Sequence, residues 1–184
     1  METQIKKYQK LNNVGLKNGV VIFGEGIDTE IPASELKQSF ELEYPVYNRS
    51  FLNLCLEDAI SLYDACVKSL MPDTILLHIG ANDSALFTKN KAEFEEKYIA
   101  LIEHIKATDK KCRIVVVSID NTEINQQLKY IANSLQCEFG DLSTVKVWNP
   151  QTTKNVTSFV QTMGVRRYCK NKPVYDLLKI LFCY

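Results

Sequence analysis

The sequence predicts an α/β fold, a three-layer α/β/α sandwich around a five-stranded parallel sheet. Short apolar runs alternate along the chain with segments in which apolar residues recur every three or four positions. The runs are continuously apolar, which is typical of parallel strands covered by helices on both faces. No internal repeat, low-complexity tract or Pro/Gly-rich linker divides the 184 residues, so we expect a single domain over residues 1–184.

The first elements are short. Residues 8–16 are expected to form an amphipathic lead-in, and the apolar run 19–23, bounded by glycine, is the first predicted strand. Residues 32–37 favour a short helix, and 43–47 a second, shorter strand. The first apolar run therefore lies at the start of a strand–helix–strand unit.

The middle of the chain has the clearest periodicity. Apolar residues spaced by three and four, with charged residues between them, predict a helix over 56–70. Pro72 ends it, because the residue before a proline avoids the helical conformation. The third strand is expected at 74–79, a helix at 94–105 and the fourth strand at 113–119.

The remaining elements complete the alternation. Residues 126–135 are predicted to be helical and 137–142 to form the fifth strand. Pro173 suits the first turn of a last, apolar helix. Residues 143–172 show little periodicity, and no element is assigned to them.

Composition excludes several classes of function. The chain is 46% hydrophobic, and its 22 basic and 22 acidic residues balance to zero net charge. No long-range field therefore favours nucleic acid or an anionic membrane, and no apolar run approaches a membrane span. The N-terminus lacks the apolar stretch of a signal peptide, so a cytoplasmic location is expected.

Cysteine and histidine usage argues against a metal or a cofactor. The six cysteines form no Cys-x-x-Cys pair, and the chain has only two histidines. Cys66 and Cys112 lie in apolar periodic segments and are interpreted as buried thiols in a reducing compartment. We expect no metal site and no cofactor.

Two turns mark the predicted site. Gly24-Glu25-Gly26 follows the first strand, and Gly80-Ala81-Asn82-Asp83 follows the third. Sites of parallel sheets lie beyond the carboxyl ends of the strands. The carboxylates of Glu25, Asp28 and Asp83 could cluster there for acid–base or metal chemistry. Alternatively, Glu25 and Asp28 cap the turn and the start of the next helix, which is the favoured interpretation.

These turns resemble the SGNH (GDSL-type) hydrolases, whose flavodoxin-like sheet has the predicted architecture. The family's first motif reads approximately Phe-x-Gly-Asp-Ser-Ile-Thr-Glu, and residues 23–30 here read Phe-Gly-Glu-Gly-Ile-Asp-Thr-Glu. Gly26 thus stands where the family has its nucleophilic serine. The resemblance extends over roughly residues 19–142.

Two further motifs match in part. Residues 46–49 resemble the second motif, in which Ser50 replaces a glycine whose N–H helps to build the oxyanion hole. Asn82 matches the family's oxyanion-hole asparagine. The resemblance therefore implies a remnant oxyanion hole of Gly26, Ser50 and Asn82, with Glu25, Asp28, Arg49 and Asp83 as candidates for the surrounding pocket.

The family's last motif, Asp-x-x-His, is missing. Residues 161–170 contain neither Asp nor His, and no histidine follows His104. His78 alternates with apolar residues of the third strand and is interpreted as a half-buried core histidine, and His104 as a solvated helix residue. Without nucleophile and base, ordinary esterase turnover is not expected.

Three functions stay open. The leading hypothesis is a catalytically inactive pseudo-esterase that binds a small acyl, carbohydrate or anionic ligand in the remnant cleft. The second is an interaction module that packs against a partner or a second copy. The third is an active esterase with a relocated nucleophile, for which Ser50 and Cys169 are the candidates.

Overall fold

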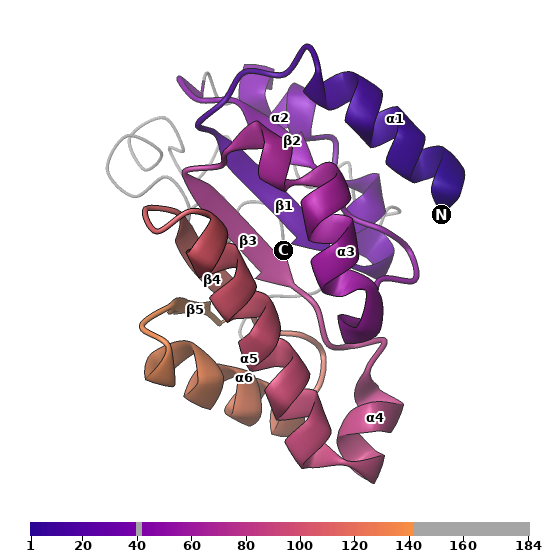
Figure 1. Cartoon of the computed structure of the whole chain (residues 1–184), viewed down its shortest axis with the longest axis vertical. Helices are drawn as coiled ribbons and strands as arrows, with labels where there is room; N and C mark the ends of the chain where they lie inside the picture. The colour runs from indigo at the N-terminus through magenta and orange to yellow at the C-terminus, as the bar shows by residue number, and fades with distance from the viewer. Residues whose placement is uncertain (40–41, 142–184) are drawn as a thin grey trace.

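The structure is a computed structural model that describes residues 1–39 and 42–141. Its centre is a five-stranded sheet in the order β2-β1-β3-β4-β5, in which every neighbouring pair is parallel (Figure 1). The strands are β1 (Val20–Gly24), β2 (Val46–Asn48), β3 (Thr74–His78), β4 (Arg113–Val117) and β5 (Glu138–Gly140). The predicted α/β architecture with five parallel strands is confirmed.

Helices lie on both sides of this sheet. The helical elements are α1 (Glu2–Asn12), η1 (Gly26–Glu30), α2 (Ala33–Ser39), α3 (Leu56–Cys66), η2 (Lys68–Leu70), α4 (Ser84–Lys89), α5 (Lys91–Thr108) and α6 (Thr122–Ser134). Figure 1 shows α3 and α5 side by side over one face, with α1 against the outside of α3. The chain runs from β1 to β2 in the direction opposite to its later crossovers, so right-handed connections put α2 on the other side.

The core lies between the sheet and the helices α3, α5 and α6. Alternate residues of the strands, among them Val21, Phe23, Ile75 and Leu77, point into it and are fully buried. Their neighbours Ile22 and Leu76 are also fully buried, on the opposite face of the sheet. Both faces are therefore covered, as the continuous apolar runs predicted.

Several boundaries differ from the predicted ones. The second strand is shifted to Val46–Asn48, and the predicted helix 56–70 divides at Val67 into α3 and η2. Met71 follows in a left-handed conformation (φ 48°), so the helix has already ended before Pro72. The short helix α4 was not predicted. Residues 143–172 and the predicted helix from Pro173 lie outside the described residues.

The predicted lead-in 8–16 is wrong in position, because the helix is α1, Glu2–Asn12. Its attachment is largely polar and gives little apolar periodicity. The Gln4 amide and the Tyr8 hydroxyl both donate to the carbonyl of Ser50, at 2.8 and 2.9 Å. Asn12 donates to the carbonyl of Cys66 at 2.7 Å. These bonds fasten α1 to the loop after β2 and to α3.

Candidate functional site

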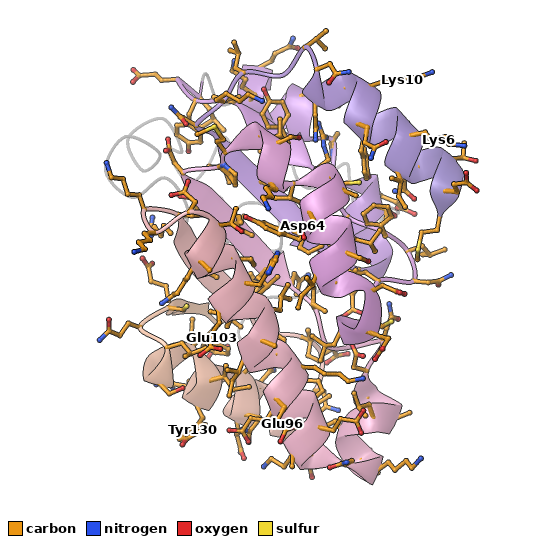
Figure 2. The ribbon with its side chains drawn as sticks, viewed as in Figure 1. Lys6, Lys10, Asp64, Glu96, Glu103 and Tyr130 are labelled. Atoms are coloured by element: carbon orange, nitrogen blue, oxygen red, sulfur yellow. The ribbon has the colours of Figure 1, made fainter. Side chains whose placement is uncertain are left out.

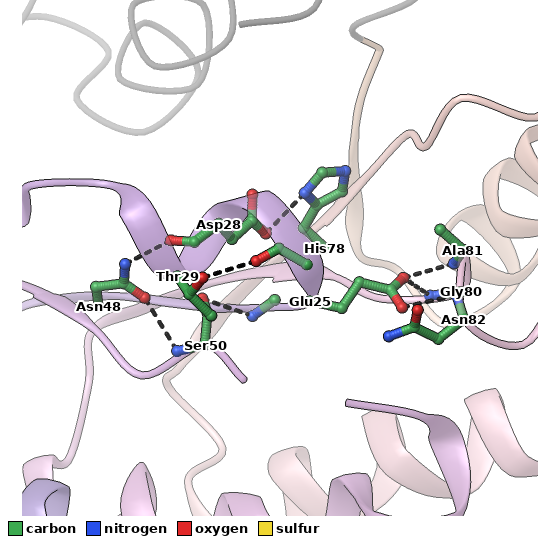
Figure 3. Close-up of polar contacts among 11 residues, drawn as sticks. Glu25, Asp28, Thr29, Asn48, Ser50, His78, Gly80, Ala81 and Asn82 are labelled. Carbon is green, nitrogen blue, oxygen red and sulfur yellow. Dashed lines mark hydrogen bonds and ion pairs between the residues drawn. The ribbon is translucent and has the colours of Figure 1, made fainter. Parts of the chain in front are cut away.

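The two predicted turns meet at the carboxyl ends of β1 and β3. Gly24 and His78 are partners in the parallel register, so Glu25 and Gly80 begin adjacent turns. Figure 3 shows Glu25, Asp28 and His78 on one side of this edge and the turn Gly80–Asn82 beside them. The topology thus brings together residues more than 50 positions apart, as the parallel sheet predicted.

The carboxylate of Glu25 is held by three successive backbone N–H groups. Gly80 donates to Oε1 at 2.6 Å, Ala81 donates to the same oxygen, and Asn82 donates to Oε2 at 2.7 Å (Figure 3). Gly80 reaches this geometry with φ 133°. Consecutive N–H groups of this kind form a nest for an anion. Burial raises the pKa of Glu25, and the three N–H groups and His78 oppose the rise.

Asp28 and His78 form an ion pair on the same edge. Oδ2 of the fully buried Asp28 lies 2.8 Å from Nδ1 of His78, whose side chain is largely buried. Burial alone would lower the pKa of His78, but Asp28, Glu25 and a hydrogen bond with the backbone of Ser118 outweigh it and raise that pKa. The pair with Asp28 therefore favours the charged form of His78.

The space at Gly26, the position that the resemblance aligns with the family's serine, is open. Gly26 has φ 57°, and a Cβ atom built on it would meet no other atom within 4 Å. Space for a serine side chain therefore exists. The backbone N–H of Gly26, however, donates to the carbonyl of Leu52 at 3.1 Å.

The other two predicted oxyanion donors are also bonded within the protein. The side-chain amide of Asn82 donates to the carbonyls of Leu52 and Leu54, at 3.2 and 2.8 Å. The N–H of Ser50 donates to Oδ1 of Asn48 at 3.0 Å. The carbonyl of Leu52 thus accepts from both Gly26 and Asn82. Two of the three donors that the family resemblance predicts therefore share one acceptor within the protein.

Ser50 is a structural residue in this arrangement. Its side chain is fully buried, and its hydroxyl accepts the N–H of Gly24 at 3.1 Å. A nucleophilic serine needs a base within hydrogen-bond reach, and the bonds of Ser50 go to backbone groups and to Asn48, Gln4 and Tyr8. The other candidate, Cys169, lies outside the described residues, as do residues 161–170.

Arg49 and Asp83 are directed elsewhere. The guanidinium of Arg49 bonds Oδ1 of Asn12 at 2.8 and 2.9 Å and packs against the rings of Tyr8 and Tyr47. It therefore braces α1 and does not join the strand-end residues. Both oxygens of Asp83 accept the N–H of Leu56, the first residue of α3, at 3.1 Å. Asp83 thus caps α3, and the three carboxylates have three separate partners.

The described part of the chain contains no metal-binding cluster, no membrane-spanning helix and no activated thiol at Cys66 or Cys112. Within residues 1–39 and 42–141, no group of three or more His, Cys, Asp or Glu side chains is placed to hold a metal ion. No helix of the same residues is long and apolar enough to cross a bilayer. Burial raises the pKa of Cys66 to about 11 and that of Cys112 to about 12, so neither thiol is a ready nucleophile.

Comparison with known proteins identifies the fold of this chain but no relative by sequence. No protein-family model matches the sequence, and no curated protein matches it. Solved structures do match. A GDSL-like lipase from Bacteroides thetaiotaomicron superposes with a TM-score of 0.62 at 16% identity, covering 89% of this chain and 98% of that one.

Two esterases give a similar result. The psychrotrophic esterase EstA from Pseudoalteromonas has a TM-score of 0.60 at 12% identity, over 84% of this chain and all of its own (100%). An acetyl xylan esterase has a TM-score of 0.54 at 17% identity, over 67% and 77%. This chain has the SGNH-hydrolase fold. At these identities the likeness concerns the fold, and the chemistry has to be argued from the residues.

Within the SGNH fold, sequence comparison located the two turns but not their bonding. The Gly26 and Asn82 positions could be aligned from their motifs. The acceptor that Gly26 and Asn82 share could not be found from the sequence, because it is the backbone carbonyl of Leu52, and any residue type would supply it. The Asp28–His78 pair was also missed, although the predicted side of β3 for His78 had separated it from the core residues Ile75 and Leu77.

Proposed function

We propose that this protein is an SGNH-fold pseudo-esterase, which acts by binding and does not hydrolyse esters. One observation carries the proposal: the carbonyl of Leu52 accepts hydrogen bonds from Gly26 and from Asn82. A substrate carbonyl would have to displace it to reach these donors. Stabilisation of an oxyanion depends on donors that are free and already in place, and here they have a partner.

The residues around this hole support the same conclusion. Gly26 has no nucleophilic atom, and His78 is paired with Asp28 in a way that favours its charged form. Loss of a triad residue lowers hydrolase rates by roughly 10⁴- to 10⁶-fold. By the resemblance to the SGNH family, none of the three triad residues is present, because Gly26 replaces the serine and residues 161–170 contain neither Asp nor His. Turnover is therefore expected to fall below detection.

The hydrogen bonds at the strand ends also favour one chemical class of ligand over another. N–H groups that would attract an anion already hold Glu25 or Leu52, and the carboxylate of Glu25 adds negative charge at the same edge. An acyl or carbohydrate ligand without charge therefore suits the cleft better than an anionic one. The open space over Gly26 is where such a ligand would lie.

The test is an ester-hydrolysis assay with p-nitrophenyl acetate and butyrate. We expect no turnover above the buffer rate for the natural chain, and none for Gly26→Ser, because its oxyanion donors remain bonded to Leu52. Turnover by the natural chain that disappears in Ser50→Ala or Cys169→Ala would overturn the proposal and identify a relocated nucleophile.

Binding is tested separately by thermal shift with acetylated monosaccharides and short-chain acyl amides. A rise in the unfolding temperature that Gly26→Leu abolishes would support a ligand in the space over Gly26. Absence of any shift across these probes, together with absence of turnover, would contradict the binding half of the proposal and favour the interaction module.

A further inference from the structure

Among the described residues, four of the seven exposed large hydrophobic side chains belong to segments at the end of the molecule opposite the site. Large hydrophobic residues with substantial exposure include Val14 (83%), Leu16 (65%), Met71 (56%) and Leu11 (43%). They belong to the end of α1, the loop before β1 and the turn before β3. These segments precede the strands, whereas Glu25 and Gly80 follow them.

Hydrogen bonds join these segments into one surface. The N–H of Asn18 donates to the carbonyl of Met71 at 3.2 Å, and Lys17 donates to the carbonyl of Ser69. The hydroxyl of Tyr47 donates to the carbonyl of Leu16 at 3.2 Å. The loop carrying Val14 and Leu16 is thus fixed beside Met71. We call Leu11, Val14, Leu16 and Met71 the apolar patch.

Lysines outnumber carboxylates in the segment that carries most of this patch. Residues 1–19 contain four lysines and one glutamate, a net charge of +3, so the rest of the neutral chain carries −3. Glu2 pairs with Lys6 at 2.6 Å. Lys7 and Lys10 are exposed on α1 and have no ion pair among the described residues. Figure 2 shows Lys6 and Lys10 projecting outward from α1.

We propose that the apolar patch and the lysines of residues 1–19 form a docking surface for an anionic lipid bilayer. Apolar side chains on a projecting loop can enter the interfacial region, while flanking lysines interact with acidic headgroups. An exposed apolar cluster marks an interaction site, and the excess of positive charge complements an anionic surface. The zero net charge of the chain hides this asymmetry. Such docking is peripheral and needs no membrane-spanning helix.

The test is co-sedimentation of the full chain with phosphatidylcholine vesicles, with and without phosphatidylserine. We expect binding to the vesicles that contain phosphatidylserine, weakening as sodium chloride is added. Val14→Ser with Leu16→Ser, and separately Lys7→Glu with Lys10→Glu, should each lower the partition coefficient at least about tenfold. All four side chains are exposed, so the unfolding temperature should be unchanged.

Matched controls lie together on α6. Tyr130 is 62% exposed and Lys129 is its exposed neighbour, so Tyr130→Ser and Lys129→Glu make the same chemical changes outside the patch. Both should bind vesicles as the natural chain does. The proposal is overturned if the natural chain stays in the supernatant, or if patch and control variants bind equally. It is also overturned if sedimentation equilibrium shows a dimer that the patch variants dissociate, since a second copy then covers the patch.

Discussion

A Cβ atom on Gly24 would lie 1.8 Å from Oδ2 of Asp28, the oxygen that bonds His78. Only glycine fits at position 24, because the carboxylate of Asp28 fills the space that a side chain would need. Gly24→Ala should expel Asp28 from its contact and destabilise the fold by about 3 kcal/mol. Urea unfolding measures this loss. Gly26→Ala is the matched control and should cost only about 1 kcal/mol, because its space is open and only its positive φ opposes a side chain.

The Asp28–His78 pair predicts a pH dependence with a definite sign. A histidine whose folded pKa is raised stabilises the fold fully below its unfolded value of about 6.5. That stabilisation is lost as the pH rises through the higher folded value. The free energy of unfolding of the natural chain minus that of His78→Gln should therefore be largest below about pH 6.5 and shrink as the pH rises above that value. A difference that grows over this range would contradict the charged pair.

Removing the carboxylate of Glu25 should leave three N–H groups without their acceptor. We expect Glu25→Ala to lower the free energy of unfolding by about 3 kcal/mol, since bonds to a charged group are individually strong. Acetate or formate in the buffer should restore part of the loss by entering the vacated nest. Glu96→Ala, at an exposed position of α5, is the control and should respond to neither change. Equal acetate effects on both variants would exclude a specific site.

Replacing Asn82 tests whether its amide holds the Leu52 carbonyl in place. Its amide ties down the loop through Leu52 and Leu54, so Asn82→Ala should cost about 1 kcal/mol, measured by thermal unfolding. It should also speed hydrogen exchange at the Gly26 amide, whose acceptor is the same Leu52 carbonyl. Asn133→Ala, on the exposed side of α6, should change neither quantity. Unchanged exchange at Gly26 would mean that Asn82 does not hold the loop.

The sequence predicted those parts of the structure that depend on apolar pattern. Continuous runs such as Thr74–His78 are strands because burial on both faces selects them, and helix α5 follows from its spacing of apolar residues. Helix α1 was misplaced because Gln4 and Asn12 hold it through polar bonds, which leave no periodic signal.

The sequence predicted where the candidate site lies, but not whether its hydrogen-bond donors are free or already bonded. Parallel strands end at one edge, so Gly26 and Asn82 could be placed near each other from their motifs alone. Whether a donor is free depends on backbone groups such as the Leu52 carbonyl, which any residue type would supply. Arg49 shows the same limit, because its stacking on Tyr8 depends on where α1 packs.

The turn after β3 is an anion-binding nest, and the anion it binds is the Glu25 carboxylate of the same chain. Because the two are joined through β1 and β3, their effective concentration is set by the sheet and does not change with solutes. The strand-end turns should therefore keep one conformation whether or not a ligand is bound over Gly26. A relative that leaves this nest empty would instead depend on an anion from solution to order the same turn.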